Sequence, residues 1–453
     1  MTNWLIKNPI DVLNGAPGRD ARVGGVDIRV RDGVIAEMAP GLAAAADETT
    51  VDASRCVVYP GWVNTHHHLF QAVLKGVPEG IDKRLFDWLR LVPYPRLTRF
   101  TPELLRVAAK VGLAELALSG TTTCADHHYL YHRDGDPTMA DVLFEVAEEM
   151  GLRFVLCRGG QTQPAAHPGY PKDLAPETLD QFLGDIQRLH GRFHDPAPNA
   201  KQRVIIAPAT PTFSVSPQDL RVIAAEARRM GLRLHSHLSE TEGYVDYCAE
   251  HYGMRPVEFV AEHDWVGEDV YYAHMVHVDE SEFSILAQTK TGIAHCPQSN
   301  ARLGSGIGPI PAMAERGIPI SIGVDGAASN EAADMISETH EAWLVHRTRM
   351  DAAATHVEDV VHWGTRGGAE ILGLDAIGTL AVGQDADLVL YDLDAPRYCG
   401  MHDPAIAPVT CAGTPHIKLS MMQGRTIVDD GVIPGLDMGE LAREAAAAVR
   451  ELV

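Results

Sequence analysis

The chain has 453 residues, more than one ordinary hydrophobic core accommodates, so a large domain of about 250–350 residues beside a smaller one is expected. Its formal net charge of −23, without any Lys/Arg cluster, argues against nucleic acid or an anionic membrane as a partner. No apolar run approaches the ~18 residues of a membrane span, and the start of the chain lacks the apolar stretch of an export signal. The 7 cysteines include no CxxC pair, which favours reduced thiols and a cytoplasmic protein.

Both ends of the chain read as short strands with tight turns. Residues 26–36 alternate apolar and polar side chains around Asp32-Gly33, which predicts a hairpin. The Ala-rich, acidic residues 40–50 predict a loop, whereas residues 378–392 and 418–431 each read as strand, turn and strand. Neither end can bury a core alone. We therefore expect a small β-sandwich domain built from residues 1–58 and 378–436, a barrel domain at 59–377 and a C-terminal helix at 437–453.

The middle of the chain alternates apolar strands with amphipathic helices. Repeated βα units imply parallel strands, and eight of them close a TIM barrel, so the fold class is α/β with a (β/α)8 barrel. The alternative is an open doubly wound sheet, but its Gly-rich phosphate fingerprint is missing. The expected strands are residues 57–63, 121–126, 153–157, 203–208, 232–237, 270–274, 292–296 and 318–325. The expected helices are residues 102–118, 139–150, 174–193, 217–230, 256–262, 280–289 and 310–316.

Histidines and acids gather where these strands end, which is the face of a TIM barrel that carries the chemistry. On a strand, alternation places His66 and His68 on one face and His67 on the other. Two imidazoles on one face make half of a metal site. One strand-end histidine is usually a packed or surface residue, but several strand ends converging indicate a site. The later strand ends carry His235, His237, Glu240, His274, His277, His295, Asn300 and Asp325.

The run from Pro60 to His68, Pro-Gly-Trp-Val-Asn-Thr-His-His-His, is similar to the first-strand signature of the amidohydrolase superfamily. With the later strand ends, the chain resembles the cytosine/guanine/chlorotriazine deaminase branch over nearly its whole length. The resemblance implies one divalent metal per subunit, Zn²⁺ first and Fe²⁺ as the alternative. Binuclear members have a bridging lysine after the fourth strand, where this chain reads Ala207-Pro208-Ala209. The implied metal ligands are His66, His68, His237 and Asp325.

His237 and His235 share a strand face, and His237 is preferred because Glu240 follows it by three residues, as in the family's His-x-x-Glu pattern. His235 would then pack deeper or support a ligand. The resemblance implies hydrolytic deamination of an electron-poor ring by metal-activated water. Glu240 would be the general acid–base, Asp325 would accept the second proton, and His274 would polarise the attacked centre. The plain alternative for Glu240 is a solvated loop carboxylate.

The substrate is expected to be a small heterocycle, which reacts with water. In related deaminases of bicyclic rings, the glutamine at the position of Gln71 hydrogen-bonds the ring amide, and such a polar contact gives strong selectivity. Trp88 could cover a flat ring or anchor a loop. The stretch 126–131 is similar to that of 8-oxoguanine deaminases. The further expected contacts are His128, Arg158, Gln163, His295 and Asn300.

An oxidised pterin or purine, of the isoxanthopterin or 8-oxoguanine type, is therefore the expected substrate. The alternative activity is that of an s-triazine chlorohydrolase or aminohydrolase, which would use the same barrel and metal. A more remote alternative is a non-catalytic barrel that serves as an assembly scaffold. The resemblance also suggests a homodimer or a larger homo-oligomer, although no segment of the sequence marks an interface.

Overall fold

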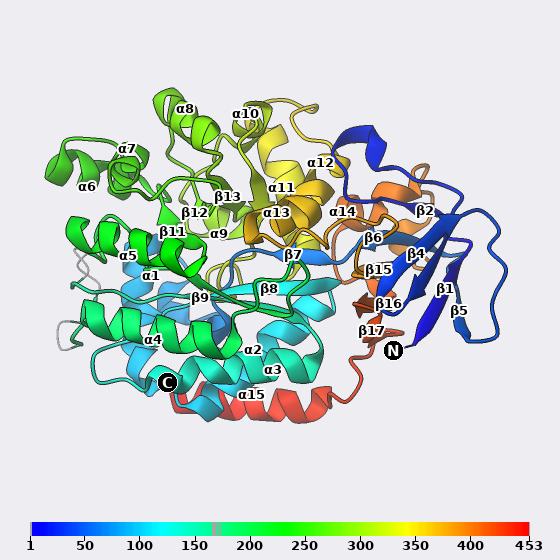
Figure 1. The fold of residues 1–453 in the computed structure, drawn as a ribbon, viewed down its shortest axis with the longest axis horizontal. Helices are drawn as coiled ribbons and strands as arrows, with labels where there is room; N and C mark the ends of the chain where they lie inside the picture. Colours follow the sequence, from blue (N-terminus) through cyan, green and yellow to red (C-terminus); the bar gives the residue numbers. More distant parts are fainter. Residues whose placement is uncertain (1, 165–169, 172–173, 453) are drawn as a thin grey trace.

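The computed structural model describes residues 2–164, 170–171 and 174–452. Its largest sheet has eight parallel strands that follow chain order around a closed barrel, so the (β/α)8 fold predicted from the sequence is confirmed (Figure 1). The barrel strands are β7 (Trp62–Asn64), β8 (Thr121–His128), β9 (Arg153–Arg158), β10 (Gln202–Ile206), β11 (Leu234–Leu238), β12 (Val270–His274), β13 (Gly292–His295) and β14 (Ile320–Ile322).

The barrel closes where β14 meets β7, at the same rim as the strand-end histidines. The amide of Thr65 donates to the carbonyl of Ile322 at 3.1 Å, and the amide of Asp325 donates to the carbonyl of His66 at 3.0 Å. His67 and Asp325 form a parallel bridge one step further along. Main-chain bonds at this seam therefore hold Asp325 beside the histidines of the first strand.

The helices cover the outside of the barrel, and their ends follow from local sequence. In α5 (Pro217–Met230), the Ser216 side chain accepts a hydrogen bond from the third helical amide, and Gly231, with a φ of 69°, ends the last turn. The other helices of the barrel are α1 (Leu85–Leu91), α2 (Pro102–Ala117), α3 (Asp141–Met150), α4 (Leu179–Phe193), α6 (Glu242–Tyr252), α7 (Pro256–Glu262), α8 (Glu280–Thr289), α9 (Pro297–Arg302), α10 (Ile310–Glu315), α11 (Met335–Arg349), α12 (Val357–His362) and α13 (Gly368–Leu372).

Two further sheets, built from both ends of the chain, pack against each other beside the barrel (Figure 1). Apolar side chains such as Ile28, Val58 and Leu388 fill the space between the sheets. One sheet contains β4 (Val34–Ala39), β3 (Asp27–Arg31), β1 (Asn3–Lys7) and β5 (Glu48–Asp52). The other contains β17 (Arg425–Asp429), β16 (His416–Met422), β15 (Leu388–Asp392), β6 (Cys56–Pro60) and β2 (Asp11–Val12).

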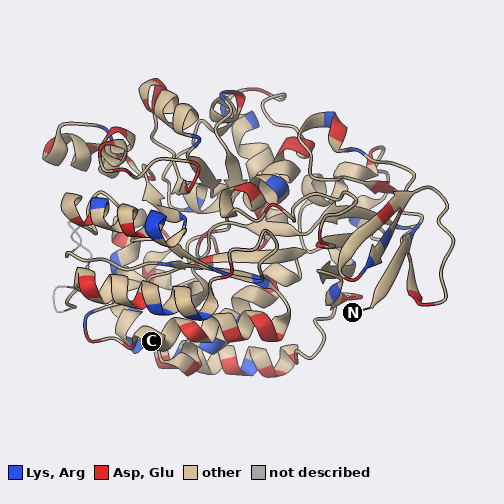
Figure 2. Cartoon of the chain, in the orientation of Figure 1, with Lys and Arg blue, Asp and Glu red and all other residues tan. Residues whose placement is uncertain are grey.

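Beyond these sheets, α14 (Ala407–Cys411) lies between β15 and β16 in the chain, and α15 (Met438–Leu452) runs along α2 at the bottom of Figure 1. The hairpin expected around Asp32-Gly33 is present as β3 and β4. Lys and Arg are interleaved with Asp and Glu along the outer helices (Figure 2). In the described ranges, no helix has both the length and the apolar character needed to cross a bilayer.

Two expectations about the strands are wrong. Residues 57–63 are expected as the first strand of the barrel, but only their second part belongs to it. Pro60-Gly61 divides the run, as these two residues predict: β6 joins the terminal sheet and β7 begins the barrel. The Gly61 amide donates to the carbonyl of Asp387 at 3.0 Å, which fixes the break. Residues 40–50 are not wholly a loop either, since Glu48 begins β5, which pairs in parallel with β1.

The junction between the barrel and the terminal sheets depends on Tyr391 of β15. Its hydroxyl accepts a hydrogen bond from the Trp62 indole at 2.6 Å and donates to the carbonyl of Ser119 at 2.6 Å. Gly120, with a φ of 96°, is required here because a Cβ atom would lie 2.4 Å from that hydroxyl. The first barrel strand is thus anchored four residues before His66.

Candidate metal centre and active site

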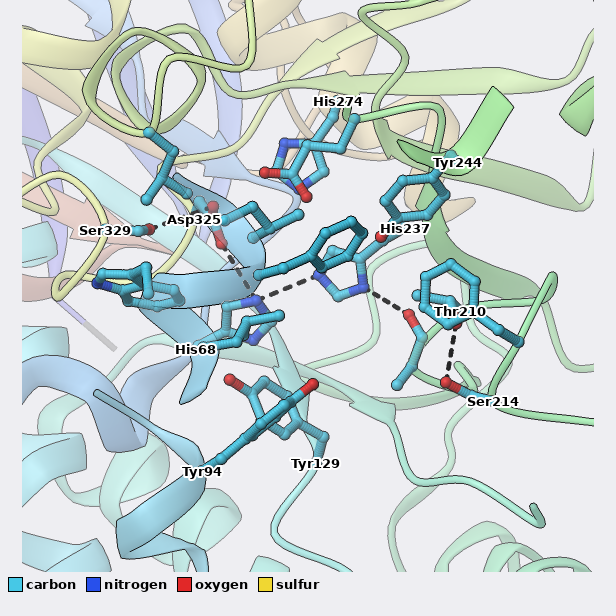
Figure 3. A pocket seen from close by; sticks show the side chains of 18 of the residues that line it. His68, Tyr94, Tyr129, Thr210, Ser214, His237, Tyr244, His274, Asp325 and Ser329 are labelled. Atoms are coloured by element: carbon cyan, nitrogen blue, oxygen red, sulfur yellow. Dashed lines mark hydrogen bonds and ion pairs between the residues drawn. The ribbon is translucent and has the colours of Figure 1, made fainter. Parts of the chain in front are cut away.

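The structure brings four residues from the ends of three barrel strands together at one rim of the barrel: His66, His68, His237 and Asp325. The Asp325 Oδ1 atom lies 3.1 Å from His68 Nε2 and 3.5 Å from His66 Nε2. His237 Nε2 lies 3.3 Å from His68 Nε2 (Figure 3). The ligand atoms of the three histidines fall within 4.8 Å of one another, as a shared metal ion requires.

The hydrogen bonds on the far side of these rings decide which nitrogen carries the proton. His68 Nδ1 donates to the carbonyl of His127 at 2.7 Å, and His237 Nδ1 donates to the carbonyl of Ala209 at 2.7 Å. Because a carbonyl can only accept, each Nδ1 holds the hydrogen and each Nε2 of a neutral ring presents a lone pair. Burial lowers the pKa of His237 and of His66 well below the usual value, which favours neutral rings.

Lone pairs that face one another and a carboxylate are unfavourable unless a cation lies between them. His66 Nε2 is buried and has no hydrogen-bond partner, as expected for a nitrogen that coordinates a metal ion. Three neutral imidazoles and one carboxylate form a donor set that suits Zn²⁺. The residues present therefore fit a single divalent metal.

Asp325 is positioned by contacts on both of its oxygens. While Oδ1 faces the histidines, Oδ2 accepts hydrogen bonds from the hydroxyls of Ser299 at 2.5 Å and Ser329 at 3.3 Å. Its backbone φ is 60°, a left-handed conformation that a residue other than glycine seldom adopts and that is often found at functional sites. These contacts leave one oxygen of the carboxylate free for an ion.

Glu240 and His274 lie next to this cluster and contact each other. His274 Nε2 lies 3.6 Å from Glu240 Oε2, and the Asn300 amide donates to His274 Nδ1 at 3.0 Å. Since Nδ1 accepts, Nε2 carries the hydrogen that points toward Glu240. Burial, and next the charge of Asp325, raise the pKa of Glu240 well above its usual value. Glu240 can therefore hold a proton near neutral pH, as a general acid–base needs.

A cavity opens in front of these groups, with about 600 Å³ of space that includes its open mouth. Its walls are aromatic and its floor is polar, a combination that suits a flat heterocycle with hydrogen-bonding edges. The aromatic lining consists of Phe86, Trp88, Tyr94, Tyr129, Phe213 and Tyr244. The polar lining includes Gln71, Thr210, Ser214 and Ser329 beside His68, His237, Glu240, His274 and Asp325 (Figure 3).

Two of the expected substrate contacts, Gln71 and Trp88, line this cavity. The Gln71 amide donates to the hydroxyl of Tyr129 at 3.0 Å. The Trp88 indole donates to the carbonyl of Ala328 at 3.2 Å, so the side chain anchors its loop and forms a wall of the cavity at the same time. Both roles considered for Trp88 are therefore compatible with its position.

Arg158 does not lie in the cavity lining, which corrects the expectation that it contacts the substrate. Its guanidinium is fully buried and makes hydrogen bonds of 2.7 and 2.6 Å to Glu177 and of 3.1 Å to Asp185. It also stacks 3.7 Å from the ring centroid of Tyr131. These contacts assign Arg158 to a buried ion cluster behind the barrel wall.

The other four expected contacts also lie outside the cavity lining. His128 is buried, and burial together with Arg158 lowers its pKa to about 3. Gln163 donates to the carbonyl of Val215 at 3.0 Å, and His295 pairs with His346 at 3.1 Å. Asn300 contacts His274 rather than the cavity, so in this arrangement its effect on a substrate is indirect.

The sequence reasoning did not single out Tyr129, Phe213, Tyr244 or the two serines on Asp325. Tyr129 directly follows the second barrel strand, and Ser329 follows Asp325 by four residues. Their positions just after barrel strands could have indicated that they lie at the site. Tyr244 lies on α6, a helix whose pattern was not recognised. Phe213 comes from the loop after β10, where sequence alone carries little positional information.

Comparison with known proteins agrees with this geometry. The Amidohydrolase family model matches residues 57–427, and the chain belongs to this family. It is 50% identical over 468 residues to an isoxanthopterin deaminase from an unknown prokaryotic organism, covering 99% of this chain and 97% of that protein. It is 41% identical over 451 residues to the 8-oxoguanine deaminase of Pseudomonas aeruginosa, covering 99% of both. A crystal structure of atrazine chlorohydrolase from Arthrobacter aurescens TC1, complexed with zinc, superposes with a TM-score of 0.91 at 25% identity, over 98% of this chain and 100% of that one.

Proposed function

We propose that this protein is a metal-dependent hydrolytic deaminase, which releases ammonia from an amino-substituted bicyclic heterocycle of the oxidised pterin or purine type. Isoxanthopterin is the first candidate and 8-oxoguanine the second, in the order of the two relatives' similarity. The observation that carries the proposal is the placement of Glu240 and His274 beside His66, His68, His237 and Asp325, at the floor of an aromatic cavity.

The metal is proposed to be Zn²⁺, with Fe²⁺ as the alternative, held by His66, His68, His237 and Asp325. When bound, it would supply activated water by lowering the pKa of that water. One ion is proposed because the fourth barrel strand runs into Ala207-Pro208-Ala209, without the lysine that bridges two ions.

The chain's own residues would manage the protons of the reaction. Water adds across a C=N bond of the ring, one proton goes to the ring nitrogen, a second goes to the amino group, and the C–N bond breaks to release ammonia. Glu240, protonated in its buried position, can pass a proton to the ring nitrogen. Asp325, 3.1 Å from His68, would accept the second proton, and the His274 Nε2–H, beside Glu240, would donate to the attacked centre.

An assay of ammonia release from isoxanthopterin and 8-oxoguanine, beside chloride release from a chlorotriazine, tests this function. Ammonia from a bicyclic ring supports it, whereas chloride release alone would favour the s-triazine alternative, to which the atrazine chlorohydrolase structure points. Glu240→Gln keeps the size of the side chain and should cut turnover by at least ~100-fold with the metal still bound. Near-normal turnover of that variant would contradict the role of Glu240.

A further inference from the structure

A fourth histidine, His235, lies beneath the metal cluster and does not line the cavity. It precedes His237 by two residues on β11, and its side chain is fully buried. Its Nε2 atom lies 2.8 Å from Nδ1 of His66, and its Nδ1 atom lies 3.0 Å from the carbonyl of Tyr271. His235 therefore connects a main-chain carbonyl to a metal ligand through both of its ring nitrogens.

The carbonyl at one end sets the direction of the first hydrogen bond in this series. Tyr271 O can only accept, so His235 Nδ1 carries the hydrogen. His235 Nε2 faces His66 Nδ1 at 2.8 Å, so one of these two nitrogens donates and the other accepts. For His66 Nε2 to present a lone pair to an ion, His66 Nδ1 carries the hydrogen and His235 Nε2 is the acceptor. His66 Nδ1 therefore donates to His235. The lone pair of His66 is then on Nε2, which lies 3.5 Å from the Asp325 Oδ1 atom.

Packing keeps this acceptor in place. The His235 ring stacks on the Tyr271 ring, with centroids 4.0 Å apart and planes 15° apart. The Tyr271 hydroxyl in turn donates to the carbonyl of Thr65, next to His66, at 3.2 Å. Tyr271 therefore contacts both His235 and the residue before His66, just after the end of β7.

We propose that His235 is a positioning residue, which fixes the tautomer and the direction of His66 for metal binding. His68 and His237 are oriented by main-chain carbonyls, which no substitution can remove, whereas His66 depends on a side-chain acceptor. Partners of this kind typically contribute 10–100-fold to metal affinity. The inference rests on the metal site proposed above.

His235→Phe preserves the shape and the stacking on Tyr271 but removes the acceptor, and His235→Leu is a second variant without an acceptor. His235→Gln restores an acceptor at the same reach as Nε2. Zn²⁺ affinity of each purified protein is measured by competition with a chelator of known affinity, and apoprotein melting is recorded in parallel. His263→Phe, a buried histidine on the outer helical layer, controls for the general cost of such a replacement.

The Phe and Leu variants should bind Zn²⁺ 10–100-fold more weakly than the wild type, while the Gln variant and the His263 control stay close to it. Wild-type affinity in either acceptor-free variant would overturn the inference. Affinity in His235→Gln as weak as in the Phe variant would also overturn it, because packing rather than hydrogen bonding would then be responsible. A wild-type chain without bound Zn²⁺ would instead reject the metal site itself.

Discussion

Replacing Arg158 by Met distinguishes a structural role from a role in substrate binding. The guanidinium is fully buried between Glu177 and Asp185, so its loss leaves the buried carboxylate of Glu177 without a cation and Asp185 with Arg188 alone. Breaking such a buried pair costs about 3–5 kcal/mol. With an unfolding entropy of about 2.1 cal/mol/K per residue, a chain of 453 residues changes by roughly 1 kcal/mol per degree, so the melting midpoint should fall by ~3–5 °C.

Calorimetry of the wild type and the variant measures the melting midpoint, and steady-state kinetics measures KM for isoxanthopterin. Arg188→Met is the comparison variant, because this arginine pairs with the same Asp185 while 29% of its own side chain is exposed. A lower midpoint with an unchanged KM is expected for Arg158→Met. An unchanged midpoint with a KM raised tenfold or more would refute the reasoning and return Arg158 to the substrate site.

Three further outcomes are expected. Asp325→Ala should lower both metal content, by elemental analysis, and turnover; full occupancy with full activity would exclude this residue as a ligand. Asn300→Leu should leave the metal bound but cut kcat by about 10–100-fold with little change in KM, because His274 loses the donor that fixes its tautomer. A dominant rise in KM would instead favour direct substrate contact. Chelator treatment should abolish ammonia release, and added Zn²⁺ should restore it; activity that survives complete removal would contradict a metal-dependent reaction.

Strand alternation explains why much of the site was predictable. His66 and His68 share a face because side chains alternate along a strand, and the barrel brings the ends of β7, β11 and β14 to one rim. Helix bounds marked by capping residues were also predictable, as for α5, whose observed ends are those expected. Strand alternation and helix capping are both local features of the sequence. In a regular fold such as this barrel, they are enough to predict where the side chains lie.

The rest depends on contacts between segments far apart in the chain. Arg158 is the last residue of β9, a position at which a substrate contact is expected, and only the return of α4 brings Asp185 to pair with it. Likewise, nothing local to Asn300 indicates that it faces His274, because that contact depends on how α9 turns after β13. Side-chain pairs of this kind depend on tertiary packing, and the spacing of apolar and polar residues along the sequence does not indicate them.

Only Gly61 separates β6 of the terminal sheet from β7 of the barrel, and this short link matters for any attempt to shorten the protein. A fragment of residues 61–377 would retain all four candidate ligands, yet β7 would become a free terminus without the Trp62–Tyr391 hydrogen bond behind it. Such a fragment should fray at the strand that carries two ligands. Truncation libraries and domain-exchange designs based on this scaffold therefore need to carry both chain ends together, as a single unit with the barrel.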